Sequence, residues 1–275
     1  MNQPGEPQDR FVGKSVPTPE FAGDDGSCSV QVRELLGAVR LGTASQYEIP
    51  RALREERAFV VVTAVLDSAE TVTDGSGNEH TVEKDSHMAS ISVTVEGGRR
   101  ALVAFTGIDA VTEWTSALAG REDLMDAEGN TFLARDLRPM PVPARNAAAA
   151  ALAEGSDFLL LDPGSAWAIA LPIPGTVALA EGRDWRDPIT DDEVLTELHS
   201  KLAPIAAQAG GSLEVSPGSP RQHDLVVTFL LPESYEAQAV PELLQSAAES
   251  LGSSSLLRLR LAQGVALSAR QQAQQ

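Results

Sequence analysis

The chain has a single cysteine, Cys28, and this scarcity excludes several kinds of chemistry. One thiol cannot form an internal disulfide, and without a CxxC partner it cannot build a zinc site or a redox pair. We therefore expect Cys28 to be free, partly buried and inert. Histidine is also rare: there are four, and none is paired at i+3 or i+4 or placed in an HExxH motif. No metal site is predicted from them.

The sequence also lacks the common catalytic and nucleotide-binding motifs. There is no GxSxG elbow, so a serine hydrolase would need a triad built without its usual turn. No GxGxxG follows a strand, and GxxxxGK[ST] is absent, which removes the usual nucleotide cradles. We predict no cofactor and no catalytic residue, and we favour a non-catalytic protein over an enzyme.

Positive charge is scarce, and long apolar runs are missing. The formal net charge is −18, which repels phosphate backbones and anionic lipid, so we expect neither nucleic-acid nor membrane binding. The longest apolar stretch, Ala58–Leu66, is far shorter than the ~20 residues of a membrane-spanning helix. The first ten residues have neither a basic region nor an apolar region of a signal peptide. These features predict a cytoplasmic protein.

Aromatic residues make up 4% of the chain, so the core must be built mostly from Ala, Val and Leu. Ala58–Leu66 is β-branched and apolar, which predicts a strand buried on both faces. Asp67–Asp85 is polar and reads as an exposed hairpin loop. The stretch Arg138–Leu171 predicts an extended proline-rich entry, an alanine-rich helix stopped by Gly155, a buried strand, a turn and a second strand.

The order of elements predicts an α+β fold with a mixed, mainly antiparallel sheet and packed helices. We expect a flexible tail over residues 1–20, a first domain over 21–187 and a smaller C-terminal domain over 188–270. The C-terminal domain has the order α-β-β-α-β, which is typical of a small α/β sandwich. Its last predicted strand is Leu256–Leu261, and Gly264–Ala269 could supply one more. Thr190 and Glu193 match a capping box at the start of its first helix.

Two short acidic segments resemble metal-binding loops but have simpler explanations. Asp74–Asn78 imitates the first positions of a calcium loop, yet Glu79 and Asp85 break two of the ligand rules, which favours a hairpin turn. Asp24 and Asp25 have no visible partner cluster, so a turn or capping role is favoured. We predict no metal.

Asp162 ends a buried strand, the position at which α/β enzymes often place a catalytic carboxylate. It precedes a proline, however, and aspartate before proline is more common as a turn former. The turn is therefore the favoured interpretation.

An ordered set of motifs resembles the SseB N-terminal domain family, the "enhanced serine sensitivity" group. The motifs are FAGDDG (21–26), Phe105-Thr106 with Trp114 downstream, RPMPV (138–142), LLLDPG (159–164) and ALAEGRDW (178–185). The resemblance covers residues ~20–187 and implies an α+β fold and a cytoplasmic location. It supplies no established reaction and no catalytic residue. The segments 67–85 and 120–130 look longer than the family pattern.

Three functional hypotheses remain from the sequence. The first is a regulatory or adaptor protein that binds another protein. The second is an amino-acid or other small-ligand sensor, or an enzyme, with a cleft near Phe105, Trp114 and Asp162. The third is a homodimer formed through the Leu256–Leu261 strand. The residues proposed for a ligand or partner surface are Asp24, Asp25, Phe105, Thr106, Trp114, Asp162 and Trp167.

Overall fold

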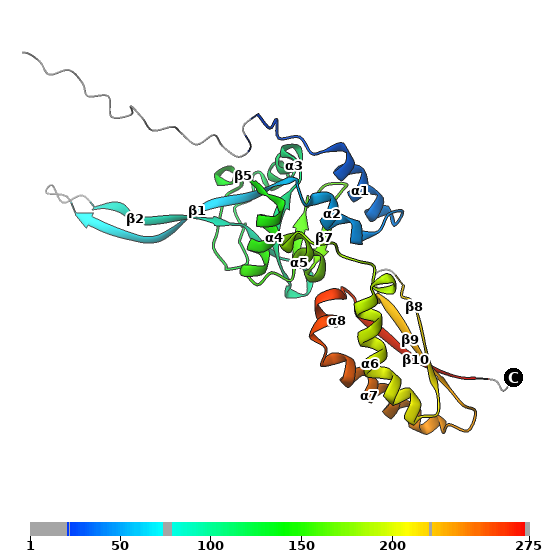
Figure 1. Cartoon of the computed structure of the whole chain (residues 1–275). Coiled ribbons are helices and arrows are strands. Elements are labelled where there is room, and N and C mark those ends of the chain that lie inside the picture. Colours follow the sequence, from blue (N-terminus) through cyan, green and yellow to red (C-terminus); the bar gives the residue numbers. More distant parts are fainter. Residues whose placement is uncertain (1–20, 22, 74–78, 220–221, 273–275) are drawn as a thin grey trace, which may run out of the picture.

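The computed structural model describes residues 21, 23–73, 79–219 and 222–272. Over these residues the chain forms two β-sheets in succession, each with packed helices (Figure 1). Most strand pairs are antiparallel, and the parallel ones are β4 with β6 and β9 with β10. The predicted α+β class with mixed, mainly antiparallel sheets is therefore confirmed. The predicted tail over residues 1–20 lies outside the described residues.

The first sheet has the strand order β2-β1-β4-β6-β7, with β3 paired to β4 and β5 paired to β1. Its strands are β1 (Arg57–Thr73), β2 (Glu79–Ser90), β3 (Ser92–Thr94), β4 (Arg100–Phe105), β5 (Arg138–Pro143), β6 (Phe158–Leu161) and β7 (Ile169–Pro172). The helices of this part are α1 (Val30–Leu41), α2 (Ile49–Leu53), α3 (Ile108–Leu118), α4 (Ala144–Ala153) and α5 (Ile173–Glu181).

Alternation along β1 and β4 places an apolar core on each face of this sheet. Val60 and Leu102 belong to the core that contains α1, α2, α4 and α5. Val61 and Phe105 belong to the opposite core, which contains α3 and residues from 124–137. The residues at the start of β1 are buried on both faces, as predicted for this strand.

The segment Asp67–Asp85, expected to be a loop, is largely strand. β1 continues to Thr73 and β2 begins at Glu79, and the two pair from Val62↔Ser90 to Thr73↔Glu79 with register shifts near Ser68. Threonine and valine in this segment favour extended backbone even though the composition is polar. The predicted turn and calcium-like residues at 74–78 lie outside the described residues.

The second sheet has the order β10-β9-β8. Its part of the chain contains α6 (Asp192–Gln208), β8 (Ser212–Pro217), β9 (Leu225–Leu231), α7 (Val240–Gly252), α8 (Ser255–Arg260) and β10 (Val265–Gln271). β9 alternates strictly between buried and half-buried residues, so one of its faces packs on the helices.

The prediction of a strand over Leu256–Leu261 is wrong, because this segment is helix α8. Ser254 caps the helix by accepting a hydrogen bond from the Leu257 amide. Arg260 forms ion pairs with Asp191 and Glu193 on the start of α6. The final strand is instead β10, in the region where the sequence suggested an additional one. This segment therefore offers no strand edge for the hypothesised dimer, and dimerisation itself stays a prediction.

The predicted capping residue of α6 is also wrong, because Asp191, and not Thr190, accepts a hydrogen bond from the Glu193 amide. α3 follows Gly107 without a side-chain cap. Ser29 caps α1 by accepting a hydrogen bond from the Val32 amide.

Contacts join the two parts near the 182–191 connection. The Tyr47 hydroxyl donates to Asp224 at 3.0 Å, and the Trp185 indole donates to the Arg260 carbonyl at 3.2 Å. The predicted division into domains at 187–188 stays a prediction. No helix of the described residues is long and apolar enough to cross a membrane.

Candidate functional site

The ends of β4 and β6 meet at one edge of the first sheet, because these neighbouring strands run parallel. There the Asp162 carboxylate accepts hydrogen bonds from the Thr106 amide at 2.7 Å and the Thr106 hydroxyl at 2.6 Å. Asp162 has a positive φ of 48°, a conformation that aspartate tolerates better than most residues. It is 1% exposed. Asp162 thus does more than form its own turn: it ties β6 to β4.

Burial raises the pKa of Asp162, since it disfavours the charged carboxylate, while the Thr106 hydrogen bonds oppose that rise. A buried carboxyl with a raised pKa is a frequent feature of active sites. In this structure, however, both of its oxygens accept hydrogen bonds from Thr106, which is itself buried. The neighbouring Phe105 is fully buried.

Arg57 links this edge to the segment before α1. Its guanidinium donates to the Asp24 carboxylate at 2.7 Å, to the Thr106 carbonyl at 2.6 Å and to the Ser27 carbonyl. The hydrogen bond from Arg57 is the largest of the causes that lower the pKa of Asp24. Asp24 also accepts a hydrogen bond from the Gly26 amide, which is the turn role favoured from the sequence.

Asp25 is exposed and has a local role. Its carboxylate accepts hydrogen bonds from the hydroxyl and the amide of Ser27, and these bonds lower its pKa. Asp24 and Asp25 therefore each stabilise a turn, and only Asp24 is connected to the strand ends. Among the described residues no group of three or more His, Cys, Asp or Glu side chains is placed to hold a metal ion.

Arg33 on α1 was not recognised from the sequence and connects α1 to α3. Its guanidinium forms a bidentate ion pair with Asp109, at 2.7 and 2.9 Å, and lies 4.4 Å from the centre of the Trp167 ring. Half-buried Cys28 lies nearby, and burial raises the pKa of its thiol. A raised pKa makes the thiolate scarce at neutral pH, which agrees with the predicted inert cysteine.

The two tryptophans proposed from the sequence lie on opposite faces of the sheet. Trp114 packs in the core that contains α3, with its ring centre 5.4 Å from that of Phe105. Trp167 packs against the other core, beside α1. Phe105 and Trp114 therefore lie together on one face of the sheet and Trp167 on the other, and a cleft near Phe105, Trp114 and Asp162 stays a prediction.

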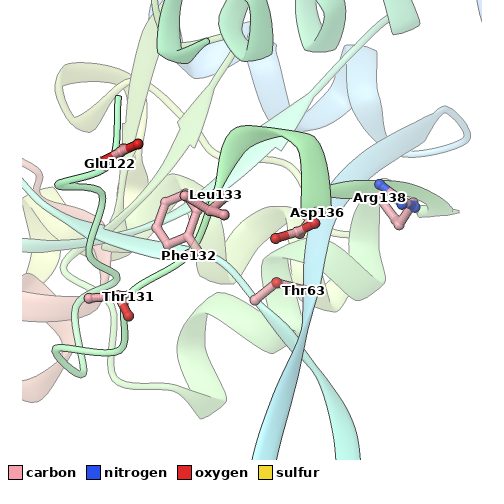
Figure 2. Close-up of a pocket in the computed structure, with 7 residues that line it drawn as sticks. All are labelled: Thr63, Glu122, Thr131, Phe132, Leu133, Asp136 and Arg138. Atoms are coloured by element: carbon pink, nitrogen blue, oxygen red, sulfur yellow. The ribbon is translucent and has the colours of Figure 1, made fainter. Parts of the chain in front are cut away.

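A separate cleft of ≈720 Å³ lies beside β1, and none of the proposed residues lines it. Figure 2 shows Phe132 and Leu133 between the carboxylates of Glu122 and Asp136, with Thr63 of β1 close to Asp136. Glu122 and Asp136 are exposed, whereas Phe132 and Thr63 are buried. The residues that line the cleft are Thr63, Glu122, Thr131, Phe132, Leu133, Asp136 and Arg138.

The cleft lies where β1 loses one of its neighbours. β5 pairs with β1 from Arg57↔Pro143 to Val62↔Arg138 and starts at Arg138. Before Arg138 the chain forms a short 3-10 helix over Ala134–Asp136, so the strand pairing with β1 ends at Arg138. In the sequence, prolines at alternate positions of β5 indicate an edge strand. No sequence signal, however, indicates that Glu122 and Phe132 approach its end.

The family model of the SseB protein N-terminal domain matches residues 32–175, which is more than half of the chain. Neither the curated proteins nor the solved structures contain a match to this sequence. The matched range begins within α1 and ends within α5, so it includes every strand of the first sheet and the Asp162–Thr106 pair. The chain belongs to the SseB family.

Proposed function

We propose that this protein is a cytoplasmic regulatory or adaptor protein that binds another protein and catalyses no reaction of its own. The observation that supports this proposal best is the ribbon formed by β1 and β2, which extends from the body of the first sheet (Figure 1). Beyond Val62, β1 pairs with β2 alone among the described residues.

A two-stranded ribbon is marginally stable in water, because only a third strand or a packed helix gives it a buried face. Its outer edges also present unpaired amides and carbonyls, which natural proteins usually cover or protect. A long ribbon that extends from a sheet therefore has a physical reason to bind a partner. Residues 67–85 contain six carboxylates and one lysine, so a basic partner surface is favoured.

The test is co-purification from native cells with the full chain and with a ribbon-shortened variant. In that variant, Asn-Gly replaces residues 67–85 and joins the paired residues Leu66 and Ser86 as a tight turn. We expect the full chain to capture a specific partner at low salt, and the shortened chain to lose it. An unchanged circular dichroism spectrum and melting temperature would show that the body is intact.

A control variant carries Glu233→Lys and Glu242→Lys, both exposed in the second part of the chain, and should retain the partner. The adaptor proposal is wrong if the full chain captures no protein beyond those that an unrelated acidic protein captures under the same conditions. It is also wrong if the shortened chain keeps the same partner in the same amount.

The second candidate is an amino-acid or other small-ligand sensor, or an enzyme, and one observation favours it. Asp162 is a buried carboxyl with a raised pKa at the carboxyl ends of two parallel strands. Trp114 and Trp167 lie on either side of this edge, so tryptophan fluorescence would report a ligand there. Titration with the amino acids tests the hypothesis, and a flat response across all of them would reject it.

A further inference from the structure

We propose that β1 accepts an extended segment of the partner as an added strand, directly beyond the end of β5, and that the adjoining cleft takes a basic side chain from that segment. This inference rests on the proposed adaptor function and specifies the surface and the chemistry of binding. It follows from the backbone of β1, from the chain path before β5 and from the charge of the cleft.

The backbone groups of β1 that face the β5 side can be identified from two hydrogen bonds. The Glu56 carbonyl, on the β5 side, accepts from the Ala144 amide at 2.9 Å, whereas the Val61 carbonyl accepts from Ile91 on the β2 side. Backbone groups alternate between the two edges of a strand, so even-numbered residues face β5. Val62 is the last of them with a β5 partner, Arg138.

Ala64 and Leu66 therefore direct their amides and carbonyls to the edge that β5 leaves. These residues remain in strand geometry through their pairing with Met88 and Ser86 of β2. Such an edge is a template for β-strand addition, in which main-chain hydrogen bonds provide affinity and pockets for alternate side chains provide specificity.

The prolines of β5 are compatible with its pairing to β1, which ends at Arg138 because the preceding residues are not in strand geometry. Pro139 and Pro141 pair with Val61 and Phe59, whose backbone groups face the β2 side, so the missing proline amides leave no β1 carbonyl unpaired. Before Arg138 the chain forms the 3-10 helix over Ala134–Asp136 and makes no further strand pair with β1. An added segment can consequently continue the line of β5 without displacing it.

The cleft beside this edge selects the charge of the added segment. The carboxylates of Glu122 and Asp136 lie on either side of Phe132 in Figure 2. Two exposed carboxylates that line one cleft suit a lysine or arginine side chain, which gains ion pairing there. Arg138, which lines the cleft, already donates to the Arg135 and Leu137 carbonyls at 2.7 and 2.9 Å. The exposed Arg135 lies 4.0 Å from the Asp136 carboxylate, and an exposed pair of this kind contributes little, so it does not prevent Asp136 from binding another cation.

The same charges argue against a second copy of this chain as the occupant. The protein carries a net charge of −18, and the ribbon itself is acidic, so two copies would repel each other at this edge. A basic, extended segment of another protein satisfies both the backbone and the charge of the site.

Two fluorescein-labelled peptides of alternating threonine and valine test the proposal, one with a central lysine and its twin with glutamate there. Fluorescence anisotropy measures their binding to the full chain. We expect at least tenfold tighter binding of the lysine peptide. Glu122→Lys with Asp136→Lys should abolish that preference, whereas Glu233→Lys with Glu242→Lys, which changes the net charge equally, should preserve it.

A second pair of variants tests the backbone. Ala64→Pro removes the amide that faces the open edge and should weaken the binding of both peptides at least tenfold. Ala64→Val keeps the amide and should bind both peptides with wild-type affinity. Bound lysine peptide should also slow hydrogen exchange at Ala64 and Leu66. Equal affinity for the two peptides, or binding that neither variant pair changes, would overturn the proposal.

The co-purification test separates this inference from the adaptor proposal. If the native partner is lost on shortening the ribbon but kept by Ala64→Pro and by Glu122→Lys with Asp136→Lys, the adaptor proposal stands and strand addition is wrong. If no native partner is captured while the peptides behave as expected, the adaptor proposal fails and the edge remains a peptide-binding site.

Discussion

The Asp162 carboxylate accepts hydrogen bonds from both the amide and the hydroxyl of Thr106, at 2.7 and 2.6 Å, and thereby connects the end of β6 to the end of β4. The two residues are separated by the whole of α3, β5 and α4 in the sequence. The Thr106 carbonyl in turn accepts a hydrogen bond from Arg57 at the start of β1, so Thr106 connects β1, β4 and β6.

Thr106→Val tests the energetic weight of that pair. The substitution keeps the shape of the side chain and removes the hydroxyl donor, so the buried carboxylate loses one of its two hydrogen bonds from Thr106. We expect the free energy of unfolding to fall by about 2 kcal/mol, as measured by urea denaturation. Thr112→Val makes the same change at an exposed position of α3 and should lower the free energy of unfolding by less than ~0.5 kcal/mol. Equal effects of the two variants would contradict the predicted role.

Asp162→Asn tests the pH dependence of stability. The pKa of Asp162 is raised above its ordinary value of 3.8, so the folded state binds more protons than the unfolded state between the two pKa values. The contribution of Asp162 to stability is therefore fully present below pH 3.8 and is lost as the pH rises through the pKa of Asp162 in the folded state. The unfolding free energy of the wild type relative to Asp162→Asn should decline over that window.

Asp109→Asn supplies a control of opposite sign. The hydrogen bond from Arg33 is the main cause that lowers the pKa of Asp109. The contribution of Asp109 to stability is therefore present above pH 3.8 and is lost as the pH falls through the pKa of Asp109 in the folded state. Urea denaturation across the acidic range should therefore show opposite slopes for the two variants relative to the wild type. Slopes of the same sign would contradict the assignment for Asp162.

Arg57→Lys tests the attachment of the segment before α1. Arg57 uses three nitrogens to reach Asp24, Ser27 and Thr106, a geometry that a lysine ammonium cannot reproduce. We expect a loss of about 2 kcal/mol in unfolding free energy and faster proteolytic cleavage within residues 23–29. Arg51→Lys, at an exposed position of α2, should change neither measurement. Unchanged cleavage in Arg57→Lys would show that the segment is held by other contacts.

Local signals in the sequence predicted much of the first part of the fold. The strand predicted from Ala58–Leu66 and the Gly155 stop after α4 each depend on signals within a few residues, and each is found as predicted. The error at Leu256–Leu261 has a physical cause as well. Six alternating residues do not distinguish a strand from a short helix, and the ion pairs of Arg260 with α6 are tertiary contacts.

The candidate site was harder to predict because its contacts are non-local. Asp162 looked like a turn residue, since its hydrogen bonds reach Thr106 across a parallel strand pair that no local pattern reveals. The cleft combines Thr63 of β1 with Glu122, Phe132 and Asp136 from a distant polar segment. Only the start of β5 was marked in advance, by the prolines that follow Arg138.

Tyr47→Phe tests whether the two sheets unfold as one unit. The Tyr47 hydroxyl donates to Asp224 at 3.0 Å, and the other oxygen of Asp224 accepts from the Gln263 and Gly264 amides at the start of the β10 connection. The tyrosine ring also packs edge-on against Trp185, with centroids 4.6 Å apart. Phenylalanine keeps that packing and removes only the hydrogen bond.

We expect Tyr47→Phe to lower the unfolding free energy by about 1 kcal/mol and to weaken the coupling of the two parts. In calorimetry the ratio of van't Hoff to calorimetric enthalpy should then fall, because the second sheet can unfold more independently. Tyr235→Phe, which follows β9 within the second part, should leave the ratio at its wild-type value. If Tyr47→Phe also leaves it unchanged, the Tyr47–Asp224 contact does not couple the two sheets, and the Trp185–Arg260 contact is then the next to test.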